Sequence, residues 1–140
     1  MYFNPDNYVS NRFYRIVPHQ GYSIESLAAY LNSTLGWLQK ELLGRTNLGQ
    51  GALDTQGTDL SRILVPNRLV SNIISKNAMN AFLNIGKRKA LPVKEELGQG
   101  DRIELDRLIL DAMGWLEYRS ELYEAVYDLV AARLQRARSI

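Results

Sequence analysis

The sequence predicts a mainly helical α+β fold, in which long amphipathic helices are accompanied by a few short strands and the chain ends in an antiparallel helix pair. Two observations lead to this prediction. Apolar residues recur at helical spacing over long segments, whereas the alternation typical of strands is confined to short runs. With 140 residues, the chain can bury one core without covalent cross-links. We expect residues 1–94 and 95–140 to form two regions of one compact unit.

The predicted order begins with a strand over residues 11–18, where polar and apolar side chains alternate until a proline. A long helix then covers residues 24–43. Ser23 is its expected N-cap, and Gly44 is expected to end it in the left-handed conformation that glycine favours. The apolar residues of this helix keep the helical spacing throughout: Ile24, Leu27, Ala28, Leu31, Leu35, Leu38 and Leu42.

Residues 44–58 contain four glycines and are predicted to form a loop with one short strand at residues 52–54. The threonine–aspartate pair that follows is expected to cap a helical turn, which leads into a brief apolar strand at residues 63–65. Another helix is predicted over residues 68–85, although its asparagines compete for backbone hydrogen bonds.

A linker over residues 92–100, whose two adjacent glutamates are interpreted as solvated, precedes the C-terminal helix pair. Asp101 and Glu104 fit a capping box that opens the first helix of the pair, and Gly114 is expected to end it. The second helix is predicted over about residues 118–136, and the short turn between the two helices indicates an antiparallel pair. Three arginines are interpreted as favourable charges at the end of its helix dipole: Arg133, Arg136 and Arg138.

The composition excludes several classes of protein. The sequence has no cysteine, which excludes a disulfide scaffold and a thiolate metal site, and its one histidine excludes a multi-histidine metal site. It has neither a long apolar run nor a signal segment, so we expect a cytoplasmic protein without membrane contact. Residues 1–94 carry 11 Lys/Arg and 5 Asp/Glu, whereas residues 95–140 carry 6 and 10. A polyanionic partner is therefore expected to meet the first region.

Catalytic motifs are missing from the sequence. We find no dinucleotide or phosphate-binding glycine motif and no nucleophile elbow. Residues 4–8 resemble the Asn-Pro-Pro-Tyr box of adenine-methylating enzymes, but Asp6 stands in place of the second proline and the aromatic residue comes one position late. No residue of this chain is therefore predicted to be catalytic.

Two segments carry residue types that bind nucleic acids. In the glycine-rich loop, arginine suits guanine edges, and the two amide side chains suit adenine edges. The predicted base contacts are Arg45, Asn47 and Gln50. The predicted phosphate contacts are Arg12, Lys87, Arg88 and Lys89. A solvated surface loop and a solvated basic run are the alternative interpretations of these two segments.

Short motifs follow one another in a defined order: Leu31-Asn32-Ser33, Gly44-Arg45, Gly49-x-Gly51-Ala52-Leu53 and Ile63-Leu64-Val65-Pro66. In order and spacing they resemble the C-terminal, target-recognition part of restriction-modification adenine-specific (N6) DNA methyltransferases. The segment Glu95-Glu96-Leu97, with Asp101-Arg102 after it, is similar to the C-termini of the same enzymes. The resemblance covers roughly residues 10–138.

The resemblance implies that this chain recognises double-stranded DNA for a catalytic methyltransferase domain or subunit. In that family a methyl group passes from S-adenosylmethionine to adenine N6. The resemblance implies this cofactor for the full enzyme, and no cofactor in this chain, because the motifs for cofactor binding and catalysis are missing here. It implies a fragment, a separately encoded specificity piece or the end of a longer enzyme. The alternative is a helical protein-interaction domain that docks onto a catalytic methyltransferase or nuclease subunit.

Overall fold

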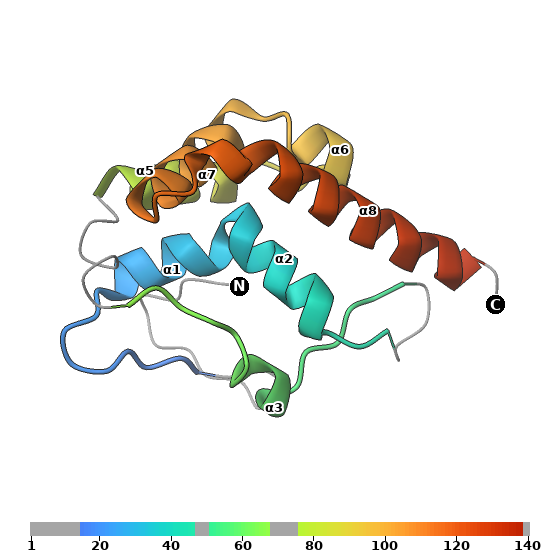
Figure 1. The fold of residues 1–140 in the computed structure, drawn as a ribbon, viewed down its shortest axis with the longest axis horizontal. Helices are drawn as coiled ribbons and strands as arrows, with labels where there is room; N and C mark the ends of the chain where they lie inside the picture. Colours follow the sequence, from blue (N-terminus) through green and yellow to red (C-terminus); the bar gives the residue numbers. More distant parts are fainter. Residues whose placement is uncertain (1–14, 47–50, 68–75, 139–140) are drawn as a thin grey trace.

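The computed structural model describes residues 15–46, 51–67 and 76–138, and these are mainly helical, as predicted. The α-helices are α1 (Ile24–Asn32), α2 (Thr34–Leu43), α3 (Gly57–Leu60), α5 (Lys76–Gly86), α6 (Val93–Glu96), α7 (Gly100–Ala112) and α8 (Arg119–Arg138), with the 3-10 helix η1 (Leu116–Tyr118) before α8. Helices α1 and α2 form one layer, which α5, α7 and α8 cover, and α3 lies on the opposite side of α2 (Figure 1). None of these helices is both long and apolar enough to cross a membrane.

The predicted helix over residues 24–43 is two helices, because Ser33 breaks it. Ser33 has an extended backbone with a ψ of 168°, and both its amide and its hydroxyl bond the carbonyl of Tyr30. The same hydroxyl accepts a hydrogen bond from the amide of Gly36, so Ser33 ends α1 and caps α2. The prediction of one continuous helix was wrong, whereas the N-cap at Ser23 is confirmed by its hydrogen bond from the Ser26 amide.

Gly44 ends α2 but does not adopt the predicted left-handed conformation, since its φ is −73° and its ψ is 160°. Glycine is needed there for a different reason: a Cβ atom would lie 2.6 Å from the side chain of Leu53. The chain after Gly44 meets the returning segment in one antiparallel bridge, in which Arg45 and Asp54 exchange two 2.8 Å backbone hydrogen bonds. The predicted strand at residues 52–54 is reduced to this bridge.

The other short strands are also absent from the residues that the structure describes. Residues 15–18 have no strand partner there, and residues 11–14 of the same prediction lie outside the described residues. The apolar segment 63–65 belongs to no strand, and helix side chains hold it in place. Gln39 bonds both the amide and the carbonyl of Leu64, and the hydroxyl of Tyr30 donates to that carbonyl at 2.9 Å. Helix side chains thus provide the hydrogen bonds that a second strand would supply.

The core joins the two predicted regions. Its larger cluster combines Ala29 and Leu31 of α1, Ala78 of α5, and Leu105 and Ile109 of α7. A second cluster unites Leu110 with three residues of α8: Leu122, Val126 and Val130. Helix α7 packs chiefly on α5, and α8 packs chiefly on α2 (Figure 1). Residues on both sides of position 94 therefore share one hydrophobic core.

The start of α7 differs from the prediction, and its end agrees with it. The N-cap is Gln99, so the capping box predicted from Asp101 and Glu104 was wrong. Asp101 instead forms an ion pair with Arg88 at 2.7 Å, and Glu104 forms one with Arg107 at 2.8 Å. The predicted linker before α7 contains the short helix α6.

Gly114 ends α7 as predicted, and here its φ of +70° does require glycine. The Gly114 amide donates to the carbonyl of Asp111, and the Trp115 amide donates to the carbonyl of Leu110. After this turn α8 runs back past α7. Tyr123 contacts Asp106, and, further along α8, Tyr127 lies near Leu97. Residues further along α8 thus lie near residues that come earlier in the chain, as expected for a helix that runs antiparallel to α7.

Candidate nucleic-acid interface

Four of the predicted nucleic-acid contacts lie in the part of the chain that the structure describes, and they occupy two places. Arg45 follows Gly44, the C-cap of α2, and Lys87, Arg88 and Lys89 directly follow α5. The remaining candidates, Arg12, Asn47 and Gln50, lie outside the described residues.

Arg45 presents a partly fixed cation at the surface. Its side chain is 45% exposed, and one terminal nitrogen, Nη2, donates to Asp59 at 3.0 Å. Asp59 is buried in the first turn of α3, where it also accepts the amide of Gln56. These two interactions hold the pKa of Asp59 below its usual value, with the backbone hydrogen bond as the larger cause. The carboxylate therefore stays ionised and orients one side of the Arg45 guanidinium.

Arg88 is an internal ion-pair partner instead of a solvated cation. Its Nε and Nη2 donate to the carboxylate of Asp101, and its Nη1 and Nη2 donate to that of Glu96, at 2.7 to 2.9 Å. Nη1 also approaches the carbonyl of Lys89 at 3.4 Å. A guanidinium has five N–H donors, so in this arrangement none remains for a DNA phosphate. The hydrogen bonds from Arg88 to Asp101 and Glu96 raise the pKa of Arg88.

Glu96 lies at the centre of this cluster, which corrects its interpretation as a solvated loop residue. It is 6% exposed and accepts hydrogen bonds from Arg88 and from two nitrogens of Arg102. Burial by itself would raise the pKa of Glu96, but the two arginines outweigh it and the pKa lies below its usual value. Arg102 also donates to the carbonyl of Asn32 at 2.5 Å. The cluster therefore joins the end of α1 to α6, α7 and the loop after α5.

Lys87 and Lys89, on either side of Arg88, are both exposed. The ammonium group of Lys87 donates to the side chain of Asn84 at 3.0 Å, which leaves it at the surface. The cluster beneath them contains two arginines and two carboxylates, so its charges cancel. These two lysines consequently carry the net positive charge of this surface.

A second basic group, which the sequence interpretation missed, lies where α2 meets the last turns of α8. Arg133 donates from Nε and Nη2 to both oxygens of Glu41 at 2.8 Å, and from Nη1 to the carbonyl of Gly51. It therefore ties α8 to α2 and to the glycine-rich loop, rather than only complementing the helix dipole. Arg45, Arg133 and Arg136 line a common cleft of about 320 Å³. No sequence signal linked these residues, because Glu41 and Arg133 are 92 positions apart.

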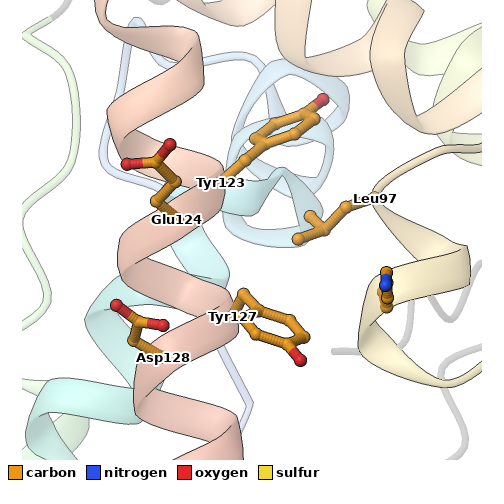
Figure 2. Close-up of a pocket in the computed structure, with 6 residues that line it drawn as sticks. Leu97, Tyr123, Glu124, Tyr127 and Asp128 are labelled. Atoms are coloured by element: carbon orange, nitrogen blue, oxygen red, sulfur yellow. The ribbon is translucent and has the colours of Figure 1, made fainter.

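A larger cleft, of about 440 Å³, lies between α6 and α8 (Figure 2). Leu97, Tyr123 and Tyr127 line it, together with the carboxylates of Glu124 and Asp128 on α8. The hydroxyl of Tyr123 donates to Asp106, and burial together with this carboxylate raises the pKa of Tyr123. Its phenol therefore stays protonated at neutral pH. One cation, Lys94, lines this cleft together with two carboxylates, Glu124 and Asp128, so its lining carries no net positive charge for a phosphate.

Residues 15–46, 51–67 and 76–138 contain no group of three or more acidic or histidine side chains that could hold a metal ion. Comparisons with known protein families, curated proteins and solved structures gave no match to this chain.

Proposed function

We propose that this chain is the target-recognition and C-terminal helical part of an adenine-specific (N6) DNA methyltransferase of a restriction-modification system. It binds double-stranded DNA in the cytoplasm. A separate domain or subunit binds S-adenosylmethionine and transfers the methyl group, and this chain holds the DNA for it.

The observation that carries the proposal is that the motifs of the resemblance interlock. Ser33, of the first motif, separates α1 from α2. At the end of α2, Gly44 leaves room for Leu53, and the next residue, Arg45, pairs with Asp54. Leu64, of the last motif, is bound by side chains from α1 and α2. Because these segments contact one another in the fold, we expect their motifs to occur together and in a fixed order along the chain.

The charges of the described surface support a polyanionic partner. Lys87 and Lys89 are exposed on one loop, and Arg45 lies at the start of the glycine-rich loop. Exposed cations of this kind position a protein on the phosphate backbone, whereas loop side chains read bases. Arg88 contributes indirectly, because its ion pairs hold the loop that carries the two lysines.

Duplex binding at several salt concentrations tests the proposal. We expect this chain to shift a DNA duplex at low salt, with an affinity that falls steeply as salt rises, because released counterions drive phosphate binding. The double variant Lys87→Gln/Lys89→Gln should reduce the slope of log affinity against log salt by about 0.9 for each phosphate that it no longer binds. Absence of binding at low salt contradicts the proposal.

A matched control separates the role of this loop from the general effect of net charge. Lys94 and Arg107 are partly or fully exposed and lie on α6 and α7. The control variant Lys94→Gln/Arg107→Gln removes the same number of charges as the test variant. If both variants reduce the salt slope equally, the loop after α5 has no particular role in binding.

One observation favours a second candidate, a helical protein-interaction domain that docks onto a catalytic methyltransferase or nuclease subunit. At the turn before α8, three large apolar side chains are exposed: Trp115 at 45%, Leu116 at 41% and Tyr118 at 54%. Contiguous exposed apolar residues commonly mark protein contacts. Light scattering and pull-down experiments with Trp115→Ser distinguish this candidate. Assembly that depends on Trp115, without DNA affinity, would favour it.

A further inference from the structure

The cleft between the end of α2 and the last turns of α8 combines positive charge with hydrogen-bond donors that are not used by other groups among the described residues. We propose that this cleft, formed by Arg45, Thr46 and Arg136 over the Arg133–Glu41 pair, binds a phosphate group of the DNA backbone. The inference rests on the proposed function for the source of the phosphate. It adds a phosphate contact that is separate from Lys87 and Lys89.

The positive charge of the cleft comes from three guanidinium groups on two elements. Arg45 follows α2, whereas Arg133 and Arg136 lie on α8. Two carboxylates neutralise part of this charge: Asp59 binds one nitrogen of Arg45, and Glu41 binds Arg133. One net positive charge remains among these five groups. The helix dipole accounts for Arg136 but not for Arg45, which belongs to another element.

Both nearby carboxylates are buried and already accept hydrogen bonds from other groups. Glu41 is 2% exposed at its side chain and accepts hydrogen bonds from Arg133 and from the indole of Trp37. Asp59 is 4% exposed at its side chain and accepts from Arg45 and from the Gln56 amide. These buried pairs fix the walls of the cleft, and each carboxylate is partly neutralised by its arginine.

The free donors belong to the exposed residues of the cleft. Arg45 uses only Nη2, and Arg136 makes only a long 3.4 Å contact from Nε to the carbonyl of Ala132, within the described part of the chain. Thr46 adds an exposed hydroxyl. Arginine N–H groups bind phosphate oxygens in pairs, and a hydroxyl completes such a site. The cleft therefore has the donors that a phosphate needs.

One tryptophan, Trp37, can report on occupancy of the cleft through its hydrogen bond to Glu41, and Trp115 serves as the reference. The indole N–H of Trp37 donates to Glu41 Oε1, and Glu41 binds Arg133 in the wall of the cleft. Trp115 lies at the other end of α8, just before η1. The sequence contains no other tryptophan, so two indole N–H resonances are expected in the proton–nitrogen NMR spectrum. Pyrophosphate in the cleft should shift the Trp37 resonance and leave that of Trp115 unchanged.

The test compares the natural chain with Arg45→Gln/Arg136→Gln and with the control Lys94→Gln/Arg107→Gln. One arm measures the salt dependence of duplex affinity, and the other follows the indole resonances during titration with pyrophosphate. We expect the cleft variant to show no Trp37 shift and to reduce the salt slope by about 0.9, the value for one phosphate contact. The control should keep both properties.

The outcomes separate this inference from the proposed function. If the natural chain binds duplex, and the cleft variant keeps the natural salt slope with no Trp37 shift in either protein, the cleft inference is overturned and the DNA proposal stands. A Trp37 shift with pyrophosphate but no duplex binding supports a site for a free phosphate compound and overturns the DNA proposal. If the natural chain neither binds duplex nor shows a Trp37 shift with pyrophosphate, both the DNA proposal and the cleft inference are overturned.

Discussion

The carboxylate of Asp106, in α7, caps the first residue of α2, Thr34, which lies 72 positions earlier in the chain. Oδ1 accepts the Thr34 amide at 2.7 Å, and Oδ2 accepts the Thr34 hydroxyl at 2.6 Å and the Tyr123 hydroxyl at 2.8 Å. Asp106 is 1% exposed. One side chain therefore stabilises the helix start that Ser33 creates and joins α2, α7 and α8.

The first prediction concerns this junction. Asp106→Ala leaves the Thr34 amide, the Thr34 hydroxyl and the Tyr123 hydroxyl without their acceptor. Each unsatisfied buried group costs about 1–3 kcal/mol, so we expect a loss of about 3 kcal/mol or more in the free energy of unfolding. Urea denaturation measures this loss. Asp111→Ala, on an exposed position of the same helix, is the control and should change stability by less than about 0.5 kcal/mol.

The second prediction uses the pKa of the same carboxyl. Burial raises the pKa of Asp106 despite its hydrogen bonds from Thr34, so the folded chain holds the proton more tightly than the unfolded chain. Its contribution to stability is then greatest below the unfolded pKa and decreases as pH rises through the folded pKa. The natural chain should therefore gain stability relative to Asp106→Asn as pH falls from about 7 to about 4. If the difference in unfolding free energy between the natural chain and Asp106→Asn stays constant over this pH range, burial does not raise the pKa of Asp106.

The third prediction concerns the ion cluster below the loop after α5. Glu96→Gln leaves Arg102, which is 8% exposed, with a buried charge that has lost its partner. Removing one member of a buried ion pair costs about 3–5 kcal/mol of stability. We expect a loss near the lower value, because Arg88 retains its ion pair with Asp101. The neighbouring Glu95→Gln removes the same charge from an exposed position and is the control. Equal stability of the two variants would exclude the role assigned to Glu96.

The fourth prediction is the acid sensitivity of this cluster. Glu96 and Asp101 have pKa values below those of ordinary carboxyl groups, because their arginine partners outweigh the opposing effect of burial. Their stabilisation is complete above the unfolded pKa values and is lost as pH falls through the folded pKa values. As the pH falls from about 5 to about 3, the free energy of unfolding should therefore decrease less for Glu96→Gln than for Glu95→Gln.

The fifth prediction compares two glycines that have open space around them. At Gly114 the φ of +70° disfavours any side chain, so Gly114→Ala should cost about 1–2 kcal/mol. Gly86 ends α5, and a Cβ there meets nothing within 4 Å. Gly86→Ala should be neutral or stabilise the chain by up to about 1 kcal/mol. Thermal denaturation of both variants checks the contrast.

Local features of the sequence were sufficient where neighbours in the chain decide the structure. The cap at Ser23 and the stop at Gly114 depend on backbone groups within a few residues, and both were predicted correctly. The apolar periodicity likewise predicted most of the helical segments. The predicted strand at residues 63–65 was wrong because a strand needs a partner strand, whereas in the fold Leu64 is bound by the side chains of Gln39 and Tyr30.

The candidate site shows the same division. Composition indicated where positive charge is concentrated, but it could not distinguish Arg88, which two carboxylates neutralise, from the exposed Lys87 beside it. Nor could it bring Arg45 and Arg136 to one cleft. The sequence by itself determined the mainly helical content, the helix ends at Ser23 and Gly114 and the overall charge, because these depend on residue type and near neighbours. Only the tertiary structure decided which charges are paired and which meet solvent, because their partners come from distant parts of the chain.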